Sequence, residues 1–197
     1  MQRRTKRLVL RDFVASDRES VRRWRSDPEV MRYLDQPRGS DPDSWFDTVL
    51  RHSAYHPRTT YDAAIVLRKT GDVIGWIGMG RTIDPGAGDL VVGYALGRQW
   101  WGHGYMTEAL VAMLEFGFTQ LGARAISAQY YVANPASARV MQKAGMRPAG
   151  RAVSANPALG ESERYIAIRD EWRKPRRRWL GLFSVLLALG LLPAAAG

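Results

Sequence analysis

The sequence predicts an α/β (α+β) fold with a mixed, mostly antiparallel central sheet of about seven strands and flanking helices. Short apolar runs separated by turn residues indicate strands, and longer segments with apolar residues at helical spacing indicate amphipathic helices. The expected elements follow in the order β-α-α-β-β-β-α-β-α-β-β. A clear parallel crossover stands in the middle of this order, so most other strand neighbours are expected to be antiparallel.

The first half of the chain begins with a strand over residues 7–11. Ser16 and Glu19 have the spacing of a capping box, which predicts a helix from there through Trp24. The pair Asp27-Pro28 interrupts this helix. A second helix is expected to start at Asp41-Pro42, because proline is favoured in the first helical position.

Strands dominate the middle of the chain, and two helices follow. A turn over residues 69–72 predicts a hairpin, and Asn134 and Gly145 predict the N-cap and the C-terminal glycine of the last helix. The expected strands are 63–68, 73–83, 89–96, 124–132, 146–153 and 163–169, and the expected helices are 107–121 and 134–145. The domain should end near Trp172.

Composition limits the chemistry and the partners. The 197 residues contain no cysteine, which excludes disulfides, thiolate metal sites and a cysteine nucleophile. The net charge of +10 fits an acidic partner such as nucleic acid, anionic lipid or a polyphosphate cofactor, but charge alone does not identify a nucleic-acid binder. Residues 1–10 lack the apolar run of a signal peptide, so a cytoplasmic location is expected.

A loop with two glycines between a strand and a helix is typical of an anion site. Gly102 and Gly104 follow a strand that ends near Leu96, and a helix begins by Thr107. Glycines let backbone amides approach phosphate oxygens, and the first amides and the dipole of the helix act at the same place. The spacing matches neither a Walker loop nor the dinucleotide fingerprint, which needs a third glycine at Thr107. The sequence therefore predicts a pyrophosphate site without a metal.

This loop resembles a known one. Gln99-x-x-Gly102-x-Gly104, followed by Tyr-Met-Thr-Glu-Ala, is similar to the coenzyme A pyrophosphate loop of the GNAT superfamily of N-acetyltransferases. Gly93-Tyr94-Ala95-Leu96 and Trp101 resemble the branch that includes the RimJ/RimL ribosomal-protein acetyltransferases. The segment 134–146 is similar to the Asn-x-x-Ser-x-Arg…Lys-x-Gly-Phe segment of the same branch.

The resemblance covers residues 7–172 and implies a GNAT fold with acetyl-CoA as cosubstrate. Strand backbone at positions 94–96 would pair with the pantetheine amides, and the loop amides would hold the pyrophosphate. Glu108 is interpreted as a first-turn residue or a structural ion pair. The implied cofactor-binding residues are Tyr94, Ala95, Leu96, Gln99, Gly102, His103, Gly104, Tyr105, Met106, Thr107, Asn134 and Ser137.

The implied catalytic residues are Ser137 and Asp89. Many superfamily members carry a tyrosine on the last helix that protonates the departing thiolate; Met141 stands there in this chain, which makes Ser137 the candidate donor. Many relatives also carry a carboxylate shortly before Gly-Tyr, where this chain has Val91 and Val92. Candidate bases are then Asp89, Glu161 and Glu163.

The expected reaction is direct attack of a primary amine on acetyl-CoA in a ternary complex. A lysine amine has a pKa of about 10.4 and needs a base, whereas a protein α-amine, at about 7.7–8.0, is already partly neutral. The missing carboxylate therefore favours a protein N-terminus as acceptor. An aminoglycoside or polyamine acceptor, a binding module for coenzyme A or a basic partner without turnover, and a homodimer are left open.

The C-terminal end differs from the rest of the chain. Residues 1–172 are interpreted as the acetyltransferase domain, 173–178 as a basic linker and 179–197 as a hydrophobic tail. The tail has no charge and just reaches the lower length of a membrane-spanning helix, with arginines before it that would keep the domain cytoplasmic. Membrane contact through this tail, docking on the domain or a partner, and a disordered extension are the alternatives.

Overall fold

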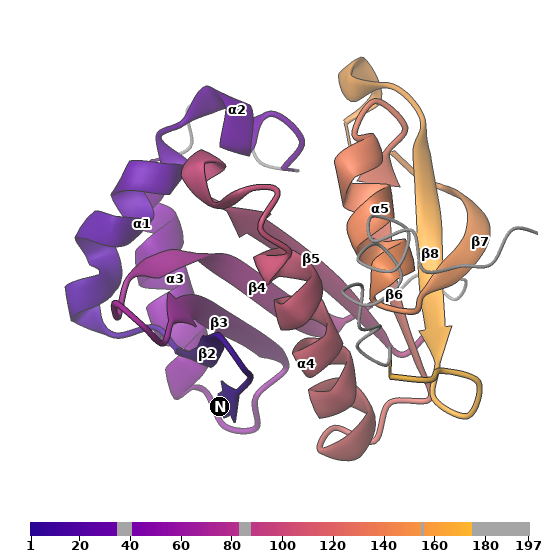
Figure 1. The fold of residues 1–197 in the computed structure, drawn as a ribbon, viewed down its shortest axis with the longest axis horizontal. Coiled ribbons are helices and arrows are strands. Elements are labelled where there is room, and N and C mark those ends of the chain that lie inside the picture. The colour runs from indigo at the N-terminus through magenta and orange to yellow at the C-terminus, as the bar shows by residue number, and fades with distance from the viewer. Residues whose placement is uncertain (35–40, 83–87, 155, 175–197) are drawn as a thin grey trace, which may run out of the picture.

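The computed structural model describes residues 1–34, 41–82, 88–154 and 156–174. In these residues the chain forms one eight-stranded sheet with helices on both faces (Figure 1). The strand order is β1-β2-β3-β4-β5-β6-β8-β7, and every described pair is antiparallel except β5 with β6. The predicted α/β class with a mixed, mostly antiparallel sheet is confirmed.

The elements lie close to their predicted places. The strands are β1 Gln2–Arg4, β2 Leu8–Asp12, β3 Thr60–Leu67, β4 Val73–Arg81, β5 Leu90–Leu96, β6 Ala125–Tyr131, β7 Arg147–Ala152 and β8 Ser162–Ile168. The helices are α1 Arg18–Arg25, α2 Pro28–Met31, α3 Pro42–Ala54, α4 Tyr105–Thr119 and α5 Pro135–Lys143.

Two local predictions need correction. The sequence analysis missed β1, whose residues Gln2, Arg3 and Arg4 are polar and carry no apolar alternation. The predicted capping box is also wrong: a 3-10 turn precedes α1, and the carboxylate of Asp17, buried beside Arg11, accepts a hydrogen bond from the Val14 amide. At the start of this helical segment, the Asp17 carboxylate therefore accepts the backbone hydrogen bond, in place of the predicted Ser16 hydroxyl.

The predicted start of α3 at Asp41-Pro42 and the two predicted ends of α5 are confirmed. The Asp41 carboxylate accepts from the amides of Asp43 and Ser44 at the start of α3. The Asn134 side chain accepts from the Ser137 amide at the start of α5. Gly145 has a φ of +84° at the end of that helix, a conformation that other residues rarely adopt.

The two faces of the sheet carry separate apolar clusters. On one face α4 covers β2, β4 and β5, and residues such as Met79 and Leu110 are fully or almost fully buried there. On the other face α1 and α3 cover β3 and β4 through an aromatic cluster that includes Phe13, Trp24 and Phe46. The sheet therefore separates two apolar clusters, one on each of its faces.

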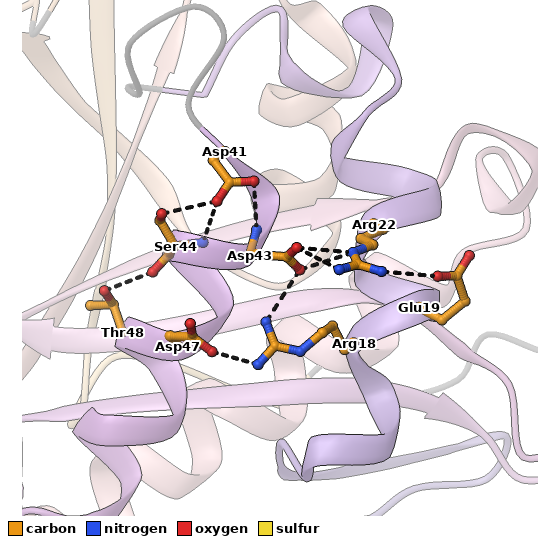
Figure 2. A network of polar contacts seen from close by, with 8 residues as sticks. All are labelled: Arg18, Glu19, Arg22, Asp41, Asp43, Ser44, Asp47 and Thr48. Carbon is orange, nitrogen blue, oxygen red and sulfur yellow. Dashed lines mark hydrogen bonds and ion pairs between the residues drawn. The ribbon is translucent and has the colours of Figure 1, made fainter.

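Ion pairs join α1 to α3 on their outer surface (Figure 2). Arg18 contacts Asp47 at 2.5 Å and Asp43 at 3.2 Å, and Arg22 contacts Asp43 at 2.6 Å. Exposed pairs of this kind contribute little singly, although a network holds its geometry better. The network keeps the two helices in register above the sheet face that they cover.

The sheet opens between β5 and β6 (Figure 1). These strands pair in parallel only at Leu90 with Ile126 and at Val91 with Ser127. Beyond Val91 the strands diverge, while β5 keeps its pairing with β4 up to Leu96. The β5 edge over residues 92–96 therefore faces an opening, and no strand of the described residues pairs with it there.

The packed part of the chain continues to Trp172. Its indole lies 5.4 Å from the Phe118 ring and donates to the Ala144 carbonyl at 2.9 Å. The predicted hydrophobic tail, and all of the linker beyond residue 174, lie outside the described residues. None of the helices in the described part combines the length and apolar character that crossing a bilayer requires.

Candidate active site

The predicted anion loop lies between β5 and α4. Gly102 and Gly104 have φ values of +77° and +74°, a region that favours glycine. A Cβ at Gly102 would meet nothing within 4 Å, so the space beside the backbone is open. Because α4 begins at Tyr105, the amides of residues 105–107 have no acceptor within the helix. The loop thus presents amides and a helix dipole to one open space.

Side chains of the loop hold its shape. The indole of Trp101 donates to the Leu96 carbonyl at 2.8 Å, which ties the loop to the end of β5. His103 Nδ1 contacts the Trp101 carbonyl at 2.7 Å, and its ring stacks on Tyr105 at 5.7 Å. Gln99 is exposed and Met106 is buried, while Thr107 is half-buried. Of the predicted loop residues, Met106 can therefore contribute through its backbone.

Arg7, which the sequence analysis did not select, lies against this loop. Its guanidinium donates to the His103 carbonyl at 2.9 Å and lies 4.5 Å from the centre of the Tyr105 ring. Its Nε also pairs with Glu108 at 2.7 Å. Burial opposes the ionised form of Glu108, but hydrogen bonds from Thr5 and Arg7 outweigh it and lower its pKa. Glu108 is thus engaged in a structural ion pair that fixes the start of α4.

The next part of the site is the unpaired edge of β5. Tyr94, Ala95 and Leu96 lie on this edge beyond the last pair with β6. Backbone N–H and C=O groups on an unpaired edge can accept an extended ligand as they would a strand. This is the place where the resemblance puts the pantetheine amides.

Tyr94 reaches across the opening to α5. Its hydroxyl lies 2.9 Å from Ser137 Oγ and donates to the Ser137 carbonyl at 3.2 Å. Burial raises the pKa of Tyr94 well above its usual range, against the smaller effect of the Ser137 hydrogen bond. Asn134 caps the same helix one turn earlier, and Met141 is buried in the core. A protonated phenol and a serine hydroxyl therefore form one pair at the opening.

Asp89 lies at the base of the opening, before β5. Its carboxylate accepts from the Arg124 amide at 2.6 Å and from the Ala125 amide at 3.4 Å. The Arg124 amide is the main cause of a lowered pKa. Asp89 is therefore a weaker proton acceptor than an ordinary carboxylate. Its hydrogen bonds to the Arg124 and Ala125 amides also tie the residue before β5 to the start of β6.

The other two candidate bases are exposed. Glu161 pairs with Arg151 at 3.4 Å. Glu163 accepts from the Tyr130 hydroxyl at 2.5 Å, and this bond raises the pKa of Tyr130 to about 12. Both carboxylates lie on the β8 side of the sheet, in or next to the strand that pairs with β6.

The loop and the open edge suit coenzyme A. The φ values and the free space at Gly102 leave room for phosphate oxygens, Arg7 adds a cation, and the β5 edge offers backbone groups to the amides of an extended arm. In the described part of the chain, no group of three or more His, Asp or Glu residues is placed to hold a metal ion.

Comparison with known proteins decides the family. Residues 7–147 match the family described as acetyltransferase (GNAT) domain. The chain belongs to the GNAT acetyltransferase family. A relative from Bacillus subtilis (strain 168), the uncharacterized N-acetyltransferase YnaD, is 30% identical over 175 residues, which is 85% of this chain and 97% of that protein. The GNAT chain is thus an acetyltransferase, and this family uses acetyl-CoA.

Solved structures share the fold. Ribosomal-protein-S5-alanine acetyltransferase from Vibrio fischeri has a TM-score of 0.72 at 20% identity, covering 88% of this chain and 99% of that one. Spermidine N-acetyltransferase from Vibrio cholerae, solved with CoA and spermine, has a TM-score of 0.70 at 15% identity, covering 84% and 98%. At such identities the likeness extends to the fold alone.

The structure brings together most of the residues predicted for the cofactor side. The loop, the β5 edge and the start of α5 surround the opening, and Tyr94 and Ser137 meet there. The side chain of Tyr94 was not among the predicted donors, because the sequence analysis gave this strand position a backbone role only. No sequence signal marks this pair, since its members lie 43 positions apart.

Proposed function

We propose that this GNAT acetyltransferase transfers the acetyl group of acetyl-CoA to the α-amine of a protein N-terminus, by direct attack in a ternary complex. The observation that carries the acceptor assignment is the absence of a carboxylate at Val91 and Val92 on β5, at the base of the opening. An α-amine, with a pKa of about 7.7–8.0, is partly neutral without a strong base, whereas a lysine amine is not.

The chain's own residues supply the binding of the cofactor. Amides of residues 102–107, aided by Arg7, would hold the pyrophosphate, and the backbone of Tyr94–Leu96 would pair with the pantetheine arm. Asn134 and Ser137 would contact its far end. Bound acetyl-CoA supplies an acetyl thioester at the opening, where backbone amides can polarise its carbonyl.

We assign protonation of the departing coenzyme A thiolate to the hydroxyl groups of Ser137 and Tyr94. Ser137 Oγ, the donor expected from the sequence, lies 2.9 Å from the Tyr94 hydroxyl. The raised pKa of Tyr94 keeps its proton in place at neutral pH. The pair can thus deliver a proton to a thiolate and share the charge between two oxygens.

The acceptor side of the opening offers one carboxylate near the start of β5. Asp89 is the carboxylate that the sequence put forward, and its backbone partners lower its pKa. An acceptor amine with a low pKa is compatible with so weak a base. Positioning of the amine in the opening then supplies a large part of the rate.

The RimJ/RimL-like branch is part of this proposal. It rests on Trp101, Gly93-Tyr94 and the Asn134–Met146 segment, and the fold of the Vibrio fischeri ribosomal-protein acetyltransferase is compatible with it. The Vibrio cholerae spermidine enzyme has the same fold, so a polyamine is the alternative acceptor.

The test is thiol release from acetyl-CoA with four acceptors. They are a peptide with a free α-amine and no lysine, the same peptide with its α-amine blocked and one lysine added, spermidine and an aminoglycoside. We expect release with the first peptide and little with the second. Release with spermidine or the aminoglycoside instead would overturn the N-terminal assignment. Release with none of them, together with a CoA-induced rise in melting temperature, would indicate a binding module.

The domain division and the tail remain proposals. We place the acetyltransferase domain at 1–172, because Trp172 still packs on α4 and α5, and we assign 173–178 to a basic linker and 179–197 to a hydrophobic segment that attaches the enzyme to the inner face of the membrane. Fractionation of cells that express the chain with and without residues 176–197 tests this. Equal distribution of both would contradict it.

A further inference from the structure

A buried carboxylate lies on the sheet face opposite α4, and the chemistry proposed above does not use it. Asp62 on β3 is only 6% exposed. Burial raises its pKa, against the opposing effects of the Trp76 hydrogen bond and of His52 and Arg58 nearby. A buried carboxylate costs free energy unless its partners compensate. If the side chain at position 62 served only to pack in this cluster, an apolar residue would be more favourable there than Asp62.

The indole of Trp76 connects Asp62 to the edge of the opening. Its Nε1 donates to Asp62 Oδ1 at 2.8 Å on β3. Its other end lies over β5, where a Cβ at Gly93 would be 3.3 Å from ring atom Cη2. The ring therefore crosses from β3 to β5 on the face that α1 and α3 cover.

Two glycines make room for this ring. A Cβ at Gly78 would lie 2.5 Å from ring atom Cζ2 and 2.6 Å from Asp62 Oδ1, distances that no side chain tolerates. Gly78 pairs with Gly93 in the β4–β5 register. Trp45 of α3 meets the Trp76 ring edge-on at 5.8 Å. The indole is thus fixed by a hydrogen bond, by the strands under it and by a neighbouring ring.

The Cη2 end of the ring lies beside the proposed place of transfer. Gly93 is exposed and Trp76 is half-buried. Consecutive strand residues point to opposite faces, so Gly93 and Tyr94 flank the same unpaired stretch of β5 from two sides. Tyr94 carries its hydroxyl to Ser137 on one side. On the other side, the indole of Trp76 lies over Gly93.

We propose that the indole of Trp76, held in place by Asp62, is the platform on which the acceptor's ammonium group binds before it loses its proton. This rests on the proposed function, since it takes the Gly93–Tyr94 edge as the place of transfer. An aromatic face attracts a cation, most strongly for tryptophan. The substrate class is a primary ammonium on a chain that can lie flat on the ring. Asp62 is a positioning residue.

The kinetic test uses the full chain and the acceptor that the thiol-release assay selects. Trp76→Leu removes the aromatic face, and we expect the acceptor KM to rise about tenfold, with Trp76→Phe in between. The KM for acetyl-CoA should not change. Asp62→Asn keeps an oxygen acceptor for Nε1 and should stay within about twofold of the wild type, whereas Asp62→Leu should approach Trp76→Phe.

Trp24→Phe is the matched control. Trp24 is buried in the same aromatic cluster, and its Nε1 has no partner among the described groups. Its replacement should leave the acceptor KM unchanged. A shift in acceptor KM that is equal in the Trp24 and Trp76 variants would overturn the platform, because it would reflect general loosening of the cluster. An Asp62→Asn variant as impaired as Asp62→Leu would overturn the positioning role of the hydrogen bond.

A binding measurement separates this inference from the proposed function. The indole N–H signal of Trp76, identified by its absence in Trp76→Phe, is followed by NMR in the CoA-bound protein during titration with the α-amine peptide and with spermidine. A shift with either amine supports the platform even where the peptide is not acetylated. An unmoved signal with both amines, while wild-type protein acetylates one of them, overturns the platform and leaves the enzyme assignment intact.

Discussion

The two faces of β5 at the opening differ in the groups that they present to a ligand. The proposed cofactor face consists of backbone amides, two glycines in a left-handed conformation and the Tyr94–Ser137 hydroxyl pair. The opposite face consists of side chains, with the Trp76 indole anchored on the buried carboxylate of Asp62. A face made of backbone suits a ligand common to the whole family. A face made of side chains can change with the acceptor while the sheet stays the same.

Substitution of Gly102 should give the largest effect, because it removes the cofactor face. Gly102→Val places a β-branched side chain at a φ of +77° and in the space left for phosphate. We expect CoA affinity to fall by about 10- to 100-fold by calorimetry. Gly71→Val is the control, since Gly71 has a φ of +81° and equally open space in the β3–β4 turn. Equal loss of CoA binding in both variants would mean that backbone strain alone is responsible.

Loss of the Tyr94 hydroxyl should come next. Tyr94→Phe removes the donor that lies 2.9 Å from Ser137 Oγ, and we expect kcat to fall about 100-fold with little change in CoA affinity. Ser137→Ala should cost about tenfold, because the phenol remains. Tyr61→Phe, a tyrosine packed on Phe116 under α4, serves as control. Wild-type kcat in Tyr94→Phe would return the donor role to Ser137 alone.

Substitution of Asp89 tests whether its carboxylate acts as a general base or only stabilises the fold. The lowered pKa of Asp89 means that its ionised form stabilises the fold above its ordinary pKa of about 3.9, and that this contribution disappears as pH falls through the folded-state pKa. Because Asp89 is partly exposed and water screens its interactions, Asp89→Asn should cost less than about 1 kcal/mol near neutral pH, and the difference from wild type should shrink below about pH 4. Thermal melting from pH 7 to pH 3 measures it.

The same variant also reports on catalysis. If the Asp89 carboxylate only secures the β6 start, the pH profile of kcat/KM keeps its wild-type midpoint in Asp89→Asn. A profile that moves to higher pH in the variant would make Asp89 the base and would contradict the structural interpretation.

The ion pairs between α1 and α3 should matter least. Asp43→Asn breaks contacts with Arg18 and Arg22 at the surface, and we expect only a small decrease in the free energy of unfolding, measured in urea. The loss should shrink further in 1 M salt, since exposed pairs are screened. A larger loss that resists salt would mean that this network, and not the aromatic cluster, holds the helices over the Trp76 face.

The backbone side of the site could be predicted from the sequence because its signals are local. Gly102, Gly104, the Asn134 cap and the glycine at 145 each fix a conformation within a few residues. Their order along the chain was enough to predict the loop and its helix. The start of α4 was two residues off, because a left-handed glycine cap carries no side-chain signal.

The side-chain part could not be predicted, because it depends on register. Asp62, Trp76 and Gly93 meet only once β3, β4 and β5 are paired in their observed alignment. A shift of one residue would send Trp76 to the other face. β1 was missed for a related reason, since its short polar strand is recognised only by its pairing with β2.

The gap between β5 and β6 has a consequence for the lifetime of the protein. Two residue pairs join β1–β5 to the strands that follow, so an extended ligand bound along the β5 edge would act as a missing strand between the two parts of the sheet. Amide hydrogens on this edge should exchange quickly in the free protein and slowly when it is occupied. Saturation at 100 times the dissociation constant adds about 2.7 kcal/mol to the free energy of unfolding. Resistance to proteolysis in solution should therefore rise with the concentration of acetyl-CoA.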